Sequence, residues 1–123
     1  MKLTKAELQV MELIWQQEKL FMKDLLEAFP EPKPAPSTLA TLLKRMQDKG
    51  FVGYTLFGNS REYYALVKKE QYFSKEVKSM IKGAFDNSAL SFASFFTTAT
   101  KLSVDELEQL KAIIDQELKK KRK

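Results

Sequence analysis

Residues 36–67, PSTLATLLKRMQDKGFVGYTLFGNSREYYALV, contain the pattern that decides the fold of this 123-residue chain. Pro36 begins a helical pattern, either as its first residue or directly before an N-cap at Ser37. Lys49 and Gly50 end the pattern with a cationic last turn and a left-handed cap. Apolar residues recur between them at the spacing of one buried helical face: Leu39, Leu42, Leu43 and Met46. The stretch is therefore predicted to begin with an amphipathic helix.

The opposite face of this helix is polar and carries small side chains at its start. Small hydroxyls let a DNA backbone come close and can donate to phosphates or base edges, and a long arginine reaches a phosphate or a guanine. The residues of this face are Thr38, Thr41, Arg45 and Asp48, flanked by Ser37 and Lys44. The alternative is the solvated face of an ordinary core helix, and the helix alone favours neither interpretation.

Two runs rich in β-branched and aromatic residues follow, at residues 51–57 and 61–67. A short turn that contains glycine, residues 58–60, joins them, which is typical of a β-hairpin. If the hairpin is a wing, Asn59 and Arg61 lie at its tip, where a wing meets the sugar–phosphate backbone. A plain hairpin tip is the alternative, and the hairpin alone favours it.

Two more helices are predicted before this stretch. Thr4 and Glu7 form a capping box. An apolar stripe follows it, made of Leu8, Met11, Ile14 and Trp15, the last of these expected in the core. A shorter helix is expected over about residues 22–29, and alternate prolines in residues 30–36 predict an extended connector. Three helices followed by a hairpin are typical of a winged helix-turn-helix, which places its third helix in the major groove of DNA.

The absence of cysteine and histidine limits the chemistry of the chain. Without them there are no disulfides or thiolate metal sites, and the commonest metal ligand and general base are missing. No glycine-rich phosphate loop or nucleophile elbow appears. We therefore expect no enzyme activity, no catalytic residue, no metal and no cofactor. No apolar run is long enough to span a membrane and no secretory signal is visible, so we expect a cytoplasmic protein without membrane insertion.

The net charge of +5 at pH 7 is unevenly distributed. Residues 1–67 contain nine Lys and Arg against eight Asp and Glu, a net charge of only +1, whereas residues 119–123 alone carry +5. Phosphate binding by the first part would therefore depend on a few locally placed cations. These are Lys44, Arg45, Lys49 and Arg61. The basic tail could add non-specific affinity for DNA, but a helix cap and a contribution to solubility are the favoured interpretations.

Past residue 68 the pattern is helical throughout, and a capping box of Ser103 and Glu106 opens the last helix. Three short helices cannot bury all of their apolar side chains, and an exposed apolar patch usually marks a partner surface. The residues expected there are Leu90, Phe92, Phe95, Phe96, Leu107, Leu110 and Ile114. A homodimer is the simplest partner, because a two-fold protein matches a palindromic operator. A monomer that packs these rings internally is the alternative.

Over residues 3 to about 118, the chain resembles the penicillinase repressors of bacteria, the BlaI/MecI/CopY group. Residues 3–15, LTKAELQVMELIW, are similar to that family's first helix, with L-T-x-x-E and then V-M-x-x-x-W. Residues 36–50 are similar to its recognition helix, residues 61–66 to its wing strand and residues 103–110 to its last helix. These motifs occur in the family's order.

The resemblance implies a dimeric repressor with an N-terminal winged helix and a C-terminal helical dimerisation region. The family's contacts to DNA on the recognition helix correspond here to Ser37, Thr38, Ala40, Thr41 and Arg45. Ala40 departs from the family, which often has a basic residue there, so the family's usual operator sequence need not apply. The copper-responsive branch carries a C-terminal cysteine cluster, and this chain has none.

The β-lactam-responsive branch implies a further partner, a membrane sensor–protease system that relieves repression. It cuts the repressor at an Asn-Phe bond in the dimerisation region. That bond corresponds here to Phe95–Phe96, so the asparagine is missing and proteolytic relief stays an open prediction.

The sequence thus predicts a mainly α-helical fold with a small β-hairpin. A winged helix-turn-helix is expected over residues 1–68, and a helical dimerisation region with a basic tail over residues 69–123. We expect the helix at about residues 37–49 to bind a palindromic double-stranded DNA operator. The predicted DNA contacts are Ser37, Thr38, Ala40, Thr41, Lys44, Arg45, Lys49, Asn59 and Arg61.

One alternative from another class stays open: a winged helix used only for protein–protein contact, which the nearly neutral first part supports. An effector-binding repressor of the MarR type is a weaker variant of the repressor, because no polar cluster lies inside the C-terminal helices.

Overall fold

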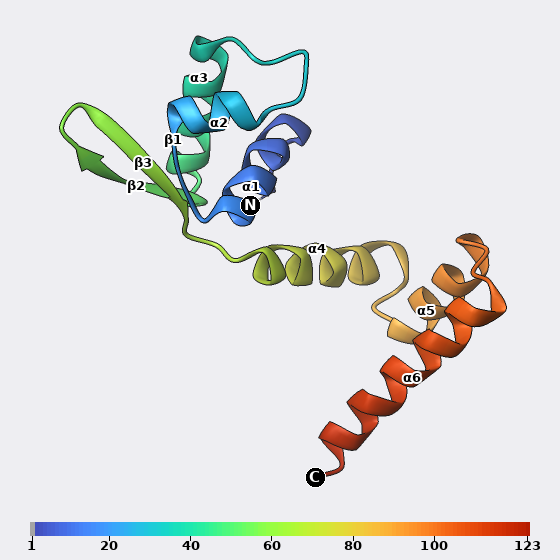
Figure 1. The fold of residues 1–123 in the computed structure, drawn as a ribbon. Coiled ribbons are helices and arrows are strands. Elements are labelled where there is room, and N and C mark those ends of the chain that lie inside the picture. The colour runs from blue at the N-terminus through green and yellow to red at the C-terminus, as the bar shows by residue number, and fades with distance from the viewer. Residues whose placement is uncertain (1) are drawn as a thin grey trace. The chain divides into compact units, whose positions relative to one another are not determined.

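The computed structural model describes residues 2–123, which form two compact units (Figure 1). The first unit ends at Ser74 and the second is Lys75–Lys123. Helix α4 (Lys69–Ala84) contributes to both. The first unit contains the residues predicted to form a winged helix-turn-helix, and the second contains those predicted to form a dimerisation region.

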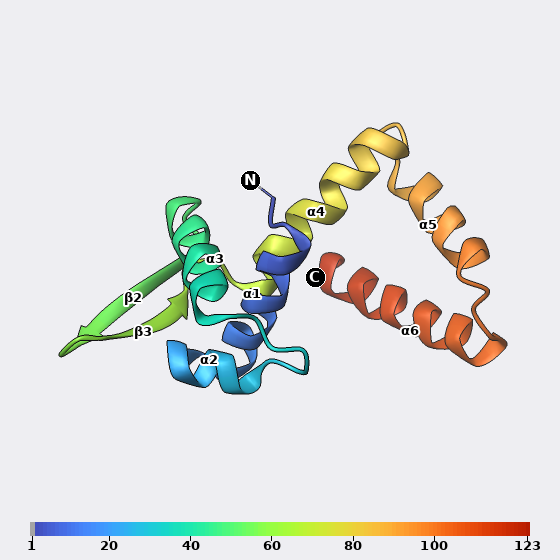
Figure 2. The ribbon, with the colours of Figure 1, turned by 90° about the horizontal axis from the view of Figure 1, so that it is seen from above.

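Three helices and a three-stranded antiparallel sheet build the first unit. The helices are α1 (Lys5–Gln17), α2 (Met22–Ala28) and α3 (Pro36–Asp48). The strands are β1 (Lys19–Phe21), β2 (Val52–Phe57) and β3 (Ser60–Ala65), in the spatial order β1-β3-β2. The β2–β3 hairpin extends away from the three helices as an arm in both ribbon views (Figure 1 and Figure 2). The prediction of a mainly helical winged-helix fold is confirmed.

Helices α1 and α3 begin where the sequence predicts, by different means. The hydroxyl oxygen of Thr4 accepts a hydrogen bond from the Glu7 backbone at 3.2 Å, and the Glu7 carboxylate accepts one from the Thr4 backbone at 2.8 Å. Helix α3 has no side-chain cap, and Pro36 is its first residue, where a missing N–H costs nothing. Of the two predicted starts of α3, the structure therefore has Pro36. Gly50 follows the helix with a φ of 82°, as expected of a left-handed cap.

Strand β1 is the element that the sequence interpretation missed. It pairs antiparallel with β3, with Leu20 opposite Tyr63 and Phe21 opposite Glu62. The hairpin turn is also shorter than predicted, since Phe57 pairs with Ser60 and only residues 58–59 turn the chain. The sheet therefore has three strands, and its central strand is β3.

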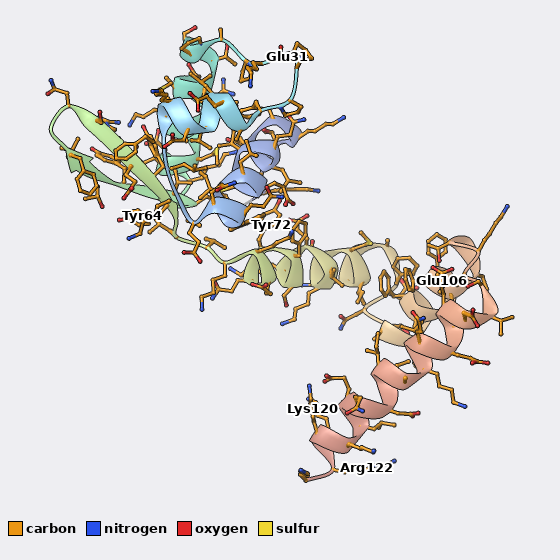
Figure 3. The ribbon with its side chains drawn as sticks, in the orientation of Figure 1. Glu31, Tyr64, Tyr72, Glu106, Lys120 and Arg122 are labelled. Atoms are coloured by element: carbon orange, nitrogen blue, oxygen red, sulfur yellow. The ribbon has the colours of Figure 1, made fainter. Side chains whose placement is uncertain are left out.

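The core of the first unit lies between the helices and the sheet. Its buried apolar residues are Leu3, Val10, Met11, Ile14, Leu20, Leu25, Leu39, Leu42, Leu43, Met46, Phe51, Val52, Tyr63 and Tyr72. Trp15 packs beside this core, as predicted: its Nε1 donates to the Val67 carbonyl at 2.9 Å, and its ring lies 6.2 Å from that of Tyr72. The Tyr72 hydroxyl accepts from the Leu3 backbone N–H at 3.1 Å (Figure 3). These contacts join the start of α4 to the first unit, which therefore continues past residue 68.

The second unit consists of the rest of α4, α5 (Ala89–Ala99) and α6 (Val104–Lys121). Ser103 and Glu106 form the predicted capping box of α6 (Figure 3), and the backbone and side-chain hydrogen bonds from Ser103 lower the pKa of Glu106. Phe85 lies 5.5 Å from Phe92 and 5.3 Å from Phe95, measured between ring centroids. In contrast to the first unit, no residue of this second unit is buried.

Candidate nucleic-acid interface

The exposed face of α3 gathers six of the residues predicted to contact DNA. They are Ser37, Thr38, Ala40, Thr41, Lys44 and Arg45, all of them exposed. The other face is fixed in the core, where Leu39 and Met46 have no exposed surface and Leu43 has 1%. Because the apolar face sets the rotation of the helix about its axis, the polar face must point to solvent.

The hydroxyls of Thr38 and Thr41, near the start of this face, differ in whether their hydrogen is free to donate to an outside partner. Thr41 Oγ1 donates to the Ser37 carbonyl at 3.0 Å, so its hydrogen is used within the helix. The oxygen and the methyl group of Thr41 remain for an outside partner. The Thr38 hydroxyl makes no hydrogen bond to any of residues 2–123, so Thr38 keeps a free donor.

The two cations of this face also differ. Lys44 Nζ lies 3.0 Å from Asp48 Oδ1 one turn later, and both side chains are more than half exposed. A surface pair of this kind contributes at most about 1 kcal/mol, so Lys44 can exchange Asp48 for a phosphate. Arg45 has no acidic partner within the part of the chain that the structure describes. Arg45 is therefore the cation that this face presents without a competing charge.

Lys49 differs from the other predicted DNA contacts, because its side chain is paired within the first unit. Its Nζ lies 2.6 Å from Oε1 of Glu7, whose side chain is fully buried near the start of α1. Burial raises the pKa of Glu7, but hydrogen bonds from Lys49 and Thr4 outweigh burial and leave the pKa below its ordinary value. Moving Lys49 to a phosphate would leave a buried carboxylate without its counter-charge, which is strongly unfavourable.

The tip of the wing carries the other predicted contacts, Asn59 and Arg61, and both are exposed. The turn has a positive φ only at Gly58 (62°), its first central residue, which matches a type II′ hairpin turn. The guanidinium carbon of Arg61 lies 4.3 Å from the centroid of the Tyr54 ring. This cation–π contact holds Arg61 against the neighbouring strand.

The residues predicted for dimerisation remain uncovered in the single chain. Leu90 is 84% exposed, and Phe95, Phe96, Leu107 and Ile114 are exposed as well, while Phe92 and Leu110 are half-buried. Val104 and Ile113 are further exposed apolar residues, at 72% and 60%, that the sequence interpretation did not single out. Val104 stands at the start of α6 and Ile113 directly beside the predicted stripe, so the helical spacing alone did not mark them.

A shallow groove between α5 and α6 runs along part of this uncovered surface. Its volume is about 210 Å³, and it is lined by Phe96, Leu102, Glu106, Gln109, Leu110 and Ile113. The basic tail begins beyond it, with three lysines in the last turn of α6 (Lys120 and Arg122 are labelled in Figure 3). Cations at this position interact favourably with the carboxyl end of the helix dipole, as the sequence predicts.

Residues 2–123 contain no group of three or more histidine, cysteine or acidic side chains placed to hold a metal ion. Over the same residues, no helix combines the length and the apolar character needed to cross a membrane.

Comparison with known proteins agrees with this geometry. The model of the penicillinase repressor family matches residues 3–116. The methicillin resistance regulatory protein MecI of Staphylococcus aureus (strain N315) is 28% identical over 115 residues, covering 93% of this chain and 94% of MecI. The penicillinase repressor of Bacillus licheniformis is 21% identical over 122 residues, covering 98% and 95% of the two chains.

Solved structures share the fold. The solution structure of the DNA-binding domain of the repressor BlaI has a TM-score of 0.52 at 24% identity, over 58% of this chain and 88% of that domain. A crystal structure of a mutant MarR from E. coli has a TM-score of 0.52 at 17% identity, over 95% of this chain and 79% of the other. With the family match over almost the whole length, the chain belongs to the penicillinase repressor family, a family of DNA-binding transcriptional repressors rather than of enzymes.

Proposed function

We propose that the chain acts as a homodimer in which each copy places α3 in the major groove of one half of a palindromic operator. The observation that carries this proposal is the polar face of α3, exposed opposite a face fixed in the core. Its first turns carry only small side chains, from Ser37 to Thr41, apart from the buried Leu39. The helix backbone can therefore come close to the base edges.

The residues of this face divide by the contact each can make. Thr38, with its free hydroxyl, donates to a base edge or a phosphate. Ala40 and Thr41 present methyl groups that match the methyl group of thymine. Lys44 and Arg45 stand further along the helix, where Arg45 reaches a guanine or a phosphate. We leave Lys49 out of the interface because its ammonium neutralises Glu7.

The uncovered second unit supports the homodimer. It has no buried residue of its own, and its exposed apolar side chains cluster on α5 and α6. A second copy of the same unit would cover them, as an isologous two-fold contact does. Two linked helix-turn-helix units then bind half-sites whose centres are about one helical turn of DNA, or a multiple of it, apart.

A winged helix that contacts only proteins is the second candidate. The observation that favours it is the net charge of +1 over residues 1–67, which provides no general attraction to phosphates. The same charge also predicts that any binding to DNA depends strongly on sequence and on a few cations. Selection of bound sequences from random double-stranded DNA therefore separates the two candidates.

In that experiment the full-length protein should enrich an inverted repeat. Arg45→Ala should then weaken binding to the enriched duplex by roughly 1–3 kcal/mol and relax the preference at one position if Arg45 reads a base. If Arg45 holds only a phosphate, the dependence of affinity on salt should fall by about one unit instead.

Arg122→Ala is the matched control, since it removes the same charge from the end of the chain and should leave sequence preference unchanged. Enrichment of no sequence at all would favour the protein-contact candidate. Equal affinity and salt dependence for wild type and Arg45→Ala would remove Arg45 from the interface.

Proteolytic relief of repression rests on the family resemblance alone. Phe95 and Phe96 lie inside helix α5, whereas proteases bind extended segments. We infer that cleavage between them requires α5 to unwind first. Mass spectrometry of the protein from cells with a derepressed promoter tests whether a sensor–protease system acts on the chain. Fragments that end at residue 95 would support such a system, and an intact chain would point to a different inducing signal.

A further inference from the structure

A cleft with two cationic side chains lies between the wing and the start of α2, and none of its lining residues belongs to α3. Its volume is about 380 Å³, and its residues come from two segments that are far apart in the sequence. One wall is made by Phe21, Met22 and Lys23, and the other by Asn59, Ser60, Arg61 and Tyr63. We propose that this cleft binds the DNA backbone at a second place, with Lys23 as its main phosphate contact.

Strand β1 is what creates the cleft. Its pairing places Phe21 opposite Glu62 on β3, so that the chain enters α2 directly beside the wing (Figure 1). The Phe21 ring lies 5.8 Å from that of Phe57 in an edge-on contact, which ties this entry to β2 as well. The Phe21 N–H donates to the Asp24 carboxylate at 3.2 Å and fixes the first turn of α2. Lys23 is therefore held at a defined distance from the wing tip.

The charges of the cleft suit an anion. Lys23 is exposed and has no acidic partner among residues 2–123, and Arg61 brings a second positive charge from the wing. No carboxylate lines the cleft. Glu62 follows Arg61 in β3 and lies opposite Phe21, but it is not among the residues that line the cleft. The carboxylate of Asp24, which follows Lys23, accepts a hydrogen bond from the backbone of Phe21.

The remaining walls indicate which anion fits. Asn59 and Ser60 provide neutral hydrogen-bonding groups at the mouth, while Phe21 and Tyr63 provide apolar surface. This combination matches a sugar–phosphate chain, which presents charged oxygens and apolar sugar edges together. Both cations are exposed, so a single free phosphate would be held only weakly. A polyanion differs, because each exposed cation that neutralises one of its phosphates adds to binding by releasing counterions.

This inference rests on the proposed function, since it assumes that the first unit binds DNA, but it concerns a contact that carries no sequence information. Its test therefore uses duplex of random sequence and measures the slope of log affinity against log salt. For the full-length protein, Lys23→Gln should reduce this slope by about one unit. Its affinity deficit should shrink by about threefold to fourfold between 50 and 200 mM salt, as expected for one lost phosphate contact.

Lys5→Gln is the matched control, because Lys5 is also an exposed lysine at the start of a helix in the first unit. It lies two residues before Glu7, near the end of α3 rather than its start. Its slope should stay closer to that of the wild type. Equal slopes for Lys23→Gln and Lys5→Gln would overturn the proposal, as only the general charge of the protein would then matter.

A second experiment places the contact on the DNA. In duplexes of the selected operator, one phosphate at a time is replaced by a neutral methylphosphonate. The wild type should lose several-fold in affinity at one position in each half-site where Lys23→Gln loses none, whereas Lys5→Gln should respond as the wild type does. Sensitivity of Lys23→Gln at every position to which the wild type is sensitive would overturn the assignment.

The outcomes separate this inference from the proposed function. If an operator is enriched but both lysine variants have the same salt slope, the chain would still be a DNA-binding repressor, and only the phosphate contact in the cleft would be ruled out. A reduced slope for Lys23→Gln without any enriched sequence would leave the cleft as a general phosphate site. A wild type that binds no duplex even at low salt would overturn both.

Discussion

Glu7 is a charged side chain without exposed surface, and it connects the start of α1 to the end of α3. Its Oε1 accepts from the Thr4 backbone at 2.8 Å and lies 2.6 Å from Lys49 Nζ, while its Oε2 has no partner among the described residues. One carboxylate thus caps α1 and holds Lys49, the residue that follows α3. Because the Lys49 side chain is 25% exposed, the two partners are not equivalent: Lys49 can turn to water, and Glu7 cannot.

Removal of Lys49 should therefore destabilise the first unit more than neutralisation of Glu7. We expect Lys49→Met to lower the free energy of unfolding by about 3–5 kcal/mol, since it leaves a buried carboxylate unpaired. Glu7→Gln should cost about 1–3 kcal/mol. The double variant should cost less than the sum of the two. Urea unfolding followed by the fluorescence of Trp15, the only tryptophan, measures all three, and strict additivity would show that the pair is not coupled.

The dependence of stability on pH follows from the same carboxylate. Hydrogen bonds from Lys49 and Thr4 outweigh burial, so the pKa of Glu7 in the folded protein lies below its ordinary value of 4.5. A lowered folded pKa stabilises the protein above the pKa of the unfolded chain, and this stability is lost as the pH falls through the folded value. The difference in unfolding free energy between wild type and Glu7→Gln should thus be constant near neutrality and shrink below about pH 4.5. A constant difference down to pH 3 would contradict this.

At the scale of elements, the sequence predicted those features that depend on residues close together in the chain. The apolar stripe of α3, its stop at Gly50 and both capping boxes follow from residues three or four positions apart, and all are present. The exposed face of α3 follows from the same stripe. Strand β1 did not follow, because three residues show no periodicity and their partner strand lies far along the chain. The Glu7–Lys49 pair spans 42 residues and is invisible to local patterns for the same reason.

The turn of the wing gives a prediction at this scale. Gly58 has a φ of 62°, a conformation that costs a residue with a side chain about 1–2 kcal/mol. Gly58→Ala should therefore destabilise the first unit by about that amount, although no atom lies within 4 Å of the added methyl group. Gly83→Ala is the control: Gly83 also has open space around it, but it lies in α4 without a positive φ, and alanine there should add about 0.5–1 kcal/mol of helix stability. Chemical denaturation of both variants checks the sign, and a neutral Gly58→Ala would show that the turn adapts.

At the scale of the whole molecule, the two units differ in whether they have a buried core of their own. The first has a buried core that includes Leu25, Leu39 and Met46, none of which has exposed surface. The second has none, and several of its large apolar side chains are at least half exposed, among them Leu90 and Ile113. Apolar surface of this extent usually marks a partner surface in a protein that stays in solution. The sequence interpretation reached Leu90 and most of this surface because three short helices could not bury so many apolar side chains, but it did not single out Ile113.

The homodimer should therefore depend on α5 and α6. We expect Phe96→Asp to sediment as a monomer at tens of micromolar, because a charge is placed where apolar surface must be buried. Ile113→Asp, in the other helix of the α5–α6 groove, should do the same. Ser91→Asp is the control, since it adds the same charge to α5 about 140° around the helix from Phe96.

The same variants connect assembly to the operator. In Phe96→Asp the fluorescence of Trp15 should stay that of the wild type, because Trp15 belongs to the first unit and reports whether that unit remains folded. Affinity for the full palindrome should nevertheless fall sharply, while affinity for a single half-site should change little, because the second half-site no longer gains from the high effective concentration that linkage provides. A wild-type protein that sediments as a monomer at tens of micromolar would contradict the homodimer directly. A monomeric Phe96→Asp that kept full affinity for the palindrome would show that the two half-sites are read independently.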